Sequence, residues 1–328
     1  MKGAQNDDLP GLADLRRAAQ RIAGHVVRTP LRRSEALSRR YGVDVWLKLE
    51  TAQHTGAFKL RGAANALLAL SRLEQSRGVV TYSTGNHGSA VAHMARTLAM
   101  PCVVCLSNLV PQAKRDRLVA FGAELVVGGA DQDAAMASAL NLAASRGLHL
   151  VAPFDNPMVI AGQGTIALEI AADLPQVGTV LVPMSGGGLF GGISVGIRAL
   201  CPDARLVAVS SAACPAMRDS LAAGLPVTVV EHPSLADSLG GGIGLANRHT
   251  FRLAQRGIDA SLVVDEAEIA SAMRTAFFDE RLVLEGAAAV GIAGLGQLDQ
   301  PRGPVVIVVT GNNVDLVQFR AVIDASMP

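Results

Sequence analysis

The chain has 328 residues, half of them apolar and 17% charged, so it can form about two folded domains and is not a disordered protein. Its 29 Lys and Arg nearly balance its 28 Asp and Glu, and the net charge of +1 excludes a protein that binds nucleic acids through bulk charge. Aromatic residues make up only 3% of the chain, which argues against a surface for stacking bases.

Short apolar runs alternate with segments of helix length along most of the chain. The apolar runs predict strands at residues 44–49, 79–83, 102–106, 124–127, 149–152, 179–184, 205–210, 261–264 and 304–310. Apolar residues at helical spacing predict helices at 59–70, 86–98, 131–145, 158–173, 266–278 and 286–295. Strands that alternate with helices form parallel sheets covered on both faces, and nine strands are many for one sheet. We therefore expect two α/β domains with a cleft between them.

Two segments bear on the compartment of the protein. Residues 1–11 carry two acidic side chains and no apolar core, so they do not predict a signal peptide. Residues 174–197 lack charge over 24 positions, but two prolines and seven glycines favour strand, loop and helix over a membrane span.

The four cysteines include one C-x-x-C pair, Cys102 and Cys105, inside a predicted strand. Residues three apart in a strand point to opposite faces, so this pair favours packing over redox chemistry. No further Cys or His spacing completes a metal site, and no metal is predicted. We expect a reduced, cytoplasmic protein.

A glycine-rich segment, SGGGLFGG at 185–192, follows a predicted strand and opens a helix. Its backbone N–H groups and the helix dipole indicate a phosphate cradle, although a tight strand–helix turn would look similar. The segment also fits G-x-G-x-x-G, but the next strand ends in Ser210 and Ser211 rather than the acidic residue of a nicotinamide site.

Lys59 lies in TGAFKLRG at 55–62, after a glycine and at the start of a predicted helix. Burial among its apolar neighbours would lower its pKa, which suits an amine nucleophile or base. By itself the pattern also fits a solvated lysine in a first helical turn.

Two more polar motifs follow predicted strands. STGNHG at 83–88 places hydroxyl, amide and imidazole groups at a helix N-terminus, which suits a carboxylate or serves as an ordinary cap. VTGNN at 309–313 ends the most apolar strand, where α/β proteins bind ligands, although alone it could be a turn. A further glycine cluster, LADSLGGGIG at 235–244, predicts a loop near the cleft.

In order and spacing, these motifs resemble the pyridoxal-phosphate (PLP) enzymes of the tryptophan-synthase β fold type, fold type II, and among them the threonine/serine dehydratases and serine racemases. The resemblance runs from about residue 29 to about residue 315. It implies two three-layer, parallel-sheet domains: a large PLP-binding domain of residues 1–49 and 156–328, and a small inserted domain of residues 50–155. It further implies a homodimer or homotetramer that acts on a small amino acid, with no nucleic-acid or membrane partner.

The resemblance assigns roles to residues of all the motifs. Lys59 would bind the cofactor covalently and later act as base, with Phe58 beside the pyridine ring and Asn86 bonded to the phenolic oxygen. Thr310 would face the pyridine nitrogen, and Glu285 would lie near the cofactor. The phosphate loop would be Gly186, Gly187, Gly188 and Leu189, and the loop that grips the substrate carboxylate would be Ser83, Thr84, Gly85, Asn86 and His87.

Departures from the family pattern narrow the expected reaction. Ser210 and Ala216 stand where related enzymes carry the acids of a divalent-cation loop. Thr84, which we expect to be catalytic together with Lys59, stands where racemases carry a serine, and its extra methyl group should hinder the acid that racemisation needs on the second face of the substrate. Residues 53–55, 235–244 and TGNN look most like dehydratases of hydroxyectoine-utilisation clusters. We expect a dehydratase that releases ammonia and a 2-oxo acid from a small hydroxy amino acid. A serine racemase or β-replacement enzyme is the alternative within the fold, and a ligand-binding regulator or nicotinamide enzyme is the alternative outside it.

Overall fold

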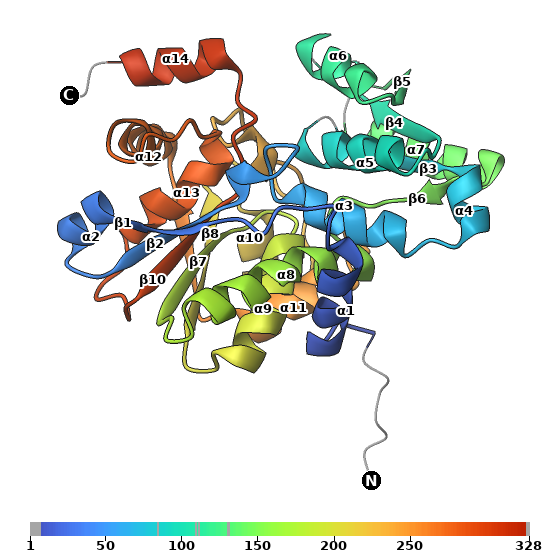
Figure 1. Cartoon of the computed structure of the whole chain (residues 1–328). Helices are drawn as coiled ribbons and strands as arrows, with labels where there is room; N and C mark the ends of the chain where they lie inside the picture. Colours follow the sequence, from blue (N-terminus) through green and yellow to red (C-terminus); the bar gives the residue numbers. More distant parts are fainter. Residues whose placement is uncertain (1–7, 84, 109, 111, 130–131, 326–328) are drawn as a thin grey trace.

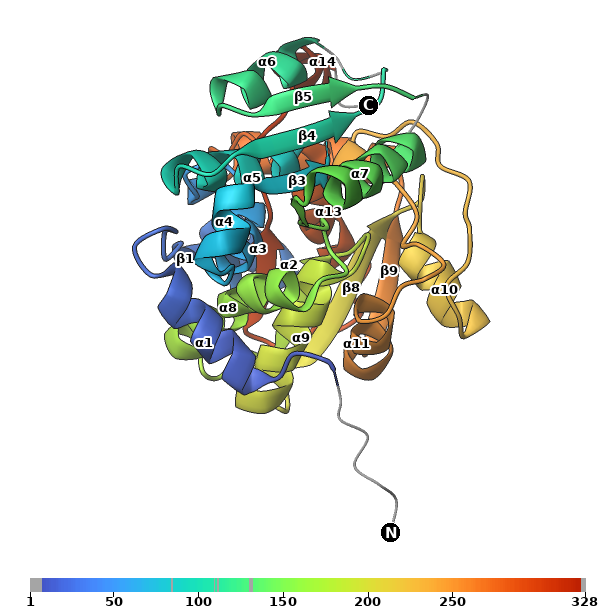
Figure 2. The same cartoon turned by 90° about the vertical axis from the view of Figure 1, so that its right-hand side faces the viewer.

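The computed structural model describes residues 8–325 except 84, 109, 111 and 130–131. Within these residues the chain forms two β-sheets, each packed between helices. Figure 1 shows them as two bodies, with the smaller sheet at the upper right, and Figure 2 shows the same separation from the side.

The larger sheet has six strands in the order β1-β2-β10-β7-β8-β9, parallel throughout except for β1. Their bounds are β1 Leu31–Ser34, β2 Val45–Leu49, β10 Val305–Val309, β7 Thr179–Pro183, β8 Arg205–Ser211 and β9 Ala260–Val264. The smaller sheet is parallel, in the order β5-β4-β3-β6. Its bounds are β5 Glu124–Val127, β4 Cys102–Leu106, β3 Val79–Tyr82 and β6 His149–Leu150.

Helices follow most of the strands and cover both sheets. Those that precede or follow the smaller sheet's strands are α3 Lys59–Leu68, α4 Arg72–Arg77, α5 Asn86–Thr97, α6 Gln112–Ala120 and α7 Gln132–Arg146. The others are α1 Leu12–Ile22, α2 Glu35–Tyr41, α8 Pro157–Asp173, α9 Gly188–Leu200, α10 Ala216–Ala223, α11 Thr250–Gly257, α12 Glu266–Phe278, α13 Gly286–Leu295 and α14 Leu316–Asp324. Two short 3-10 turns are η1 Glu50–Ala52 and η2 Asp237–Leu239.

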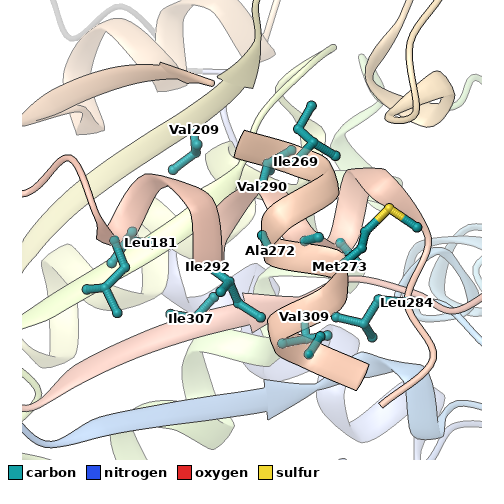
Figure 3. Close-up of a cluster of buried hydrophobic side chains, with 14 of the residues drawn as sticks. Leu181, Val209, Ile269, Ala272, Met273, Leu284, Val290, Ile292, Ile307 and Val309 are labelled. Atoms are coloured by element: carbon teal, nitrogen blue, oxygen red, sulfur yellow. The ribbon is translucent and has the colours of Figure 1, made fainter. Parts of the chain in front are cut away.

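The central strands of the larger sheet are buried on both faces, as apolar runs in parallel sheets predict. In β10, Val305, Ile307 and Val309 pack on one side, whereas Val306 and Val308 pack on the other. Figure 3 shows the first side, where side chains of β7, β8 and β10 meet those of α12 and α13. Helices α8 to α11 cover the opposite side.

The nine strands predicted from the sequence are all present, with ends within two residues, and the α/β prediction is confirmed. The tenth strand of the described residues, β1, was not predicted. Its sequence, LRRS, has no apolar run, and it pairs antiparallel with β2 at the sheet edge. The proposed domain boundaries at 49/50 and 155/156 stay a prediction, although the smaller sheet lies wholly within 79–150.

Helix α8 lies in backbone contact with both α3 and α9. A Cβ on Gly162 of α8 would lie 2.7 Å from the Cα of Gly62 in α3. A Cβ on Gly164 would lie 2.7 Å from the carbonyl oxygen of Gly192 in α9. No side chain larger than hydrogen fits at these positions without a shift, so glycines fix α3 and α9 on one supporting helix.

The structure accounts for the uncharged stretch at 174–197 and for the pair Cys102 and Cys105. No helix among the described residues is long and apolar enough to cross a membrane, and residues 174–197 form a loop, β7, the glycine loop and most of α9. Cys102 and Cys105 lie on opposite faces of β4, in different apolar clusters, and all four cysteines are free and buried. Burial raises the pKa of Cys102 to about 12, which leaves it an unreactive thiol.

Candidate active site

The loop before Lys59 lies against the end of β10. Ala57 and Gly311 form an isolated antiparallel bridge. The Phe58 N–H donates to the Thr310 carbonyl at 3.0 Å, and the Asn312 N–H donates to the Gly56 carbonyl at 3.0 Å. The TGAFKLRG and TGNN motifs, about 250 residues apart, are therefore one structural unit.

Lys59 is the first residue of α3 and is partly buried. Its Nζ donates to the Pro153 carbonyl at 2.8 Å and lies 5.3 Å from the centre of the Phe58 ring. Burial lowers the pKa of Lys59 from 10.5 to about 8, although the Glu285 carboxylate opposes the shift. A sizeable fraction of this amine is thus neutral near physiological pH, which a solvated lysine would not be.

The glycine loop lies beside the same segment. A Cβ on Gly186 would lie 2.5 Å from the ring of Phe154, the residue after the Pro153 that binds Lys59. Gly187 has φ +85° and caps α9, and among the described residues no side chain caps this helix. The N–H groups of the first turn, including those of Gly188 and Leu189, are therefore open to an anion.

The STGNHG motif, residues 83–88, follows β3 and includes the first turn of α5. Gly85 caps α5, Asn86 is its first residue, and no described side chain caps it, so its N-terminus is also open to an anion. The Gly85 N–H lies 3.4 Å from Ser83 Oγ, and both residues are partly buried. Thr84, predicted to contact the substrate, lies outside the described residues.

His87 is placed differently from what its motif suggests. Its imidazole is 2% exposed, and its Nε2 lies 3.0 Å from the Val151 carbonyl oxygen. A carbonyl only accepts, so Nε2 carries the proton. Burial lowers the pKa of His87 to about 3, and the ring is therefore neutral. Only its backbone N–H is left to contact a substrate carboxylate.

Asn86 links the start of α5 to one buried carboxylate. Its Nδ2 donates to both oxygens of Glu285, at 2.8 and 3.1 Å. Burial raises the pKa of Glu285 to about 7, and the nearby Asp237 carboxylate adds to the shift. A Cβ on Gly311 would lie 2.6 Å from Glu285 Oε1, so this position needs glycine for the carboxylate to fit. Thr310, the residue before it, is 4% exposed and directly follows β10.

Several supporting residues had no predicted role. Asp155 accepts from the N–H groups of Arg248, His249 and Thr250, at 2.8, 2.9 and 2.9 Å. The Thr250 Cβ would lie 3.0 Å from a Cβ on Gly187, so Asp155 holds a loop that borders the glycine loop. No local pattern marks Asp155, because its partners are more than 90 residues away.

A buried ion-pair network supports the first turn of α3. Arg61 is fully buried and bonds Glu50 at 2.8 Å and Glu169 of α8 at 2.6 Å. Lys48 also bonds Glu169, at 2.5 Å. Burial disfavours the charge on Arg61, but the two carboxylates still raise its pKa above the ordinary value. Two cations face two carboxylates, so the network is balanced, and removing one member would leave a buried charge unpaired.

The expected absence of a metal at the 210–216 loop stays a prediction. Among the described residues, no group of three or more His, Cys, Asp or Glu side chains is placed to hold a metal ion. Ser210 Oγ donates to the Met184 carbonyl at 2.9 Å, and Ala216 is the first residue of α10. These two positions have structural roles in the fold.

The loops together fit a phosphate-bearing aldehyde such as PLP. An amine of lowered pKa lies beside an uncapped, glycine-lined helix N-terminus, and both contact residues 153–154. The model of the family described as "Pyridoxal-phosphate dependent enzyme" matches residues 22–311. The chain belongs to the PLP-dependent enzymes.

Similar proteins refine this assignment. A protein of Sinorhizobium fredii (strain NBRC 101917 / NGR234), described as a candidate threonine dehydratase, is 45% identical over 95% of each chain. The L-threonine ammonia-lyase of Thermotoga maritima is 37% identical over 96% of this chain and 79% of its own. The structure of maize serine racemase is 30% identical, covers 95% of this chain and 96% of its own, and has a TM-score of 0.89.

These similarities confirm the predicted family, cofactor and fold type II. The chain is a PLP-dependent carbon–nitrogen lyase. The individual cofactor and substrate contacts assigned from the sequence stay predictions.

The lowered pKa of Lys59 predicts how the PLP enzyme reconstitutes. Only a neutral amine attacks an aldehyde, so the rate of PLP uptake by the apoprotein is expected to rise with pH and level off above about 8. Stopped-flow absorbance at roughly 410–420 nm, where PLP bound to lysine absorbs, measures this rate. A rate that keeps rising to about pH 10 would assign Lys59 an ordinary pKa instead.

Proposed function

We propose that this PLP enzyme is a dehydratase of the threonine/serine type. It removes the β-hydroxyl and the amino group of a small hydroxy amino acid and yields a 2-oxo acid and ammonia. The observation that carries the proposal is the Lys59 amine, with its pKa of about 8, next to the glycine loop through residues 153–154. PLP, when bound there, supplies an electron sink for the electrons released when the substrate Cα–H bond breaks.

The N-terminus of α5 is proposed to bind the substrate carboxylate. Its uncapped first turn presents backbone N–H groups, and the helix dipole favours an anion there. Asn86 lies in this turn and also contacts Glu285, so carboxylate binding and the cofactor site share one residue. The substrate amino group is then proposed to face Lys59.

Lys59 is proposed to take the α-proton. An amine with a pKa near 8 is a base of suitable strength near neutral pH, and its approach is fixed by the start of α3. The proton moves from the substrate Cα to Nζ, the β-hydroxyl leaves with its bonding electrons, and the same proton is passed on to it, so that water is released and the amine is neutral again. The resulting enamine is hydrolysed to the 2-oxo acid and ammonia, so one water is released and one consumed.

The hydroxyl of Thr310 favours elimination over racemisation. Its position after β10 suits the proposed contact with the pyridine nitrogen, to which a hydroxyl can donate without transferring a proton. An aspartate at this place would stabilise the protonated ring and thereby a long-lived carbanion. The methyl group of Thr84 is proposed to favour elimination as well, because it would hinder the acid that must reprotonate the opposite face of the substrate in racemisation.

The substrate is proposed to be threonine- or serine-like, or an amino acid derived from hydroxyectoine. The two curated relatives described above act, by name, on threonine, which supports the first class. The second rests on residues 53–55, 235–244 and TGNN. Of these, Gln53 has a structural role, because its side-chain amide pairs with the N–H and carbonyl of Val27, at 3.0 and 2.8 Å.

An ammonia-release screen tests the reaction and its substrate. The holoenzyme is expected to release ammonia and a 2-oxo acid in equal amounts from at least one of L-threonine, L-serine, 3-hydroxyaspartate and a hydroxyectoine-derived amino acid. Coupled dehydrogenase assays measure both products. No ammonia from any of the four would reject the proposal.

A serine racemase or β-replacement activity is the second candidate, and the similarity to maize serine racemase favours the former. We expect little D-amino acid to form. Chiral chromatography of substrate recovered at partial turnover measures the ratio. Racemisation faster than ammonia release would move the function to this alternative.

We also propose a cytoplasmic homodimer or homotetramer that acts on small amino acids, with no nucleic-acid or membrane partner. Four free, buried cysteines support a reducing compartment. Sedimentation velocity of the purified holoenzyme measures the assembly.

A further inference from the structure

The second asparagine of TGNN has no role in the proposed mechanism, yet it contacts Asn86 directly. Asn313 follows β10 and is partly buried. Its Nδ2 donates to the Thr55 carbonyl at 2.8 Å and to Asn86 Oδ1 at 2.6 Å. One amide group therefore links the loop before Lys59 to the first residue of α5.

The Thr55 carbonyl determines which way the Asn313 amide faces. A carbonyl oxygen only accepts hydrogen bonds, so the side of Asn313 that meets it must be the NH2 group. The carbonyl also accepts from Arg117 Nη2 of α6, at 3.2 Å, and is thus held between two donors. An asparagine amide is nearly symmetric in shape, and its orientation is fixed by its partners alone.

The orientation of Asn313 in turn determines that of Asn86. Because Asn313 offers NH2, Asn86 must present its oxygen to it. The NH2 group of Asn86 then faces Glu285, at 2.8 and 3.1 Å. If Asn86 were reversed, its oxygen would meet the Glu285 oxygens and its NH2 would meet the NH2 of Asn313. The contact between the two NH2 groups would be repulsive at any pH, and the contact between the oxygens would be repulsive whenever Glu285 is ionised.

We propose that Asn313 is a positioning residue that fixes which side of Asn86 donates, so that the NH2 group now bonded to Glu285 is the one that would meet the cofactor's phenolic oxygen. The inference rests on the proposed place of Asn86 beside that oxygen. Asn313 itself does not touch the reacting atoms. The Thr55 carbonyl fixes the orientation of the Asn313 amide, and Asn313 in turn fixes the orientation of the Asn86 amide.

Asn313→Asp tests this inference, with Asn312→Asp as the matched control. An aspartate at 313 can only accept, so it repels the Thr55 carbonyl and makes Asn86 turn its NH2 away from the cofactor. Asn312 is exposed, and among the described residues its side chain has no hydrogen-bond partner. Its hydrogen bond to the Gly56 carbonyl comes from the backbone N–H, which the substitution leaves in place. The same chemical change one residue away is expected to alter nothing.

The probes are two cofactor analogues that cannot form a covalent bond with Lys59. Pyridoxine 5′-phosphate keeps the phenolic oxygen, and its 3-deoxy analogue lacks it. Equilibrium dialysis measures the affinity of each apoprotein for both. Wild type and Asn312→Asp are expected to prefer pyridoxine 5′-phosphate by about tenfold, the value of one buried hydrogen bond. Asn313→Asp is expected to lose this preference while it binds the 3-deoxy analogue normally.

Each other result has a distinct meaning. Equal weakening toward both analogues in Asn313→Asp would show a merely structural role and overturn the inference. A preference retained in Asn313→Asp would do the same. No preference in the wild type would reject the place of Asn86, and the inference with it, while the ammonia assay would still decide the proposed function.

If Asn313→Asp does not fold, as judged by circular dichroism, Asn313→Ser replaces it. A serine hydroxyl can donate to only one of the two acceptors and is expected to reduce the preference by at least threefold.

Discussion

Replacing Lys59 with alanine is expected to lower ammonia release by about 10³-fold or more, because the covalent anchor and the proposed base are lost together. The absorbance band at roughly 410–420 nm should disappear as well. In the native enzyme, borohydride should fix PLP to the peptide that contains Lys59. The chain has only four lysines, at positions 2, 48, 59 and 114, so peptide mass spectrometry identifies the labelled residue without ambiguity.

Lys114→Ala is the matched control for this experiment. Lys114 is partly exposed and pairs with Asp237 at 2.9 Å, so its loss is not expected to remove the label. A visible band and a labelled peptide in Lys59→Ala would contradict the assignment of Lys59.

The second large effect is expected at the glycine loop. Gly187→Asp should weaken PLP binding by about a hundredfold, because an aspartate is strained at φ +85° and its charge repels a phosphate. The site is also crowded, since a Cβ there would lie 2.6 Å from the Met217 Cε. Dialysis against limiting PLP measures the affinity.

Gly224→Asp separates backbone strain from phosphate repulsion. Gly224 has a similar φ of +75°, at the end of α10, and no atom lies within 4 Å of its Cβ position. It should cost stability without changing PLP affinity. If the two variants bind PLP equally well, the glycine loop is only a turn.

The parts of the site that sequence could predict are local. Lys59 begins a helix after a glycine, and the glycine loop joins a strand to a helix, so short windows contain the whole signal. Strand positions were also predictable, because the buried strands are continuous apolar runs. The edge strand β1 was not, since its residues carry charge and its pairing depends on β2.

Other features depend on residues far apart in the sequence. Arg61 and Glu169 are 108 positions apart, and buried charges are uncommon enough that neither suggests the other. The burial of the His87 ring depends on Val151, and the role of Asn313 depends on Thr55. The residue types of TGNN indicated a polar site, but only the three-dimensional arrangement shows which atom donates to which.

The glycine contacts of α8 have a mechanical consequence. Helix α3 begins with the proposed covalent anchor and α9 with the proposed phosphate cradle, and both rest on α8 through Gly162 and Gly164. Residues 56–58 are further tied to the end of β10. The distance that a cofactor must span between the two helix starts is therefore set by how closely α3 and α9 pack on α8.

Asn86 and the carboxylate-binding turn of α5, by contrast, follow β3 of the smaller sheet. Helix α5 nevertheless shares one buried apolar cluster with α3, which includes Leu60 and Leu67 of α3 and Met94 of α5. The turn proposed to bind the substrate carboxylate is therefore held against the helix that begins with Lys59. The proposed sites for carboxylate, amine and phosphate are thus spaced by one continuous packing of α5, α3, α8 and α9.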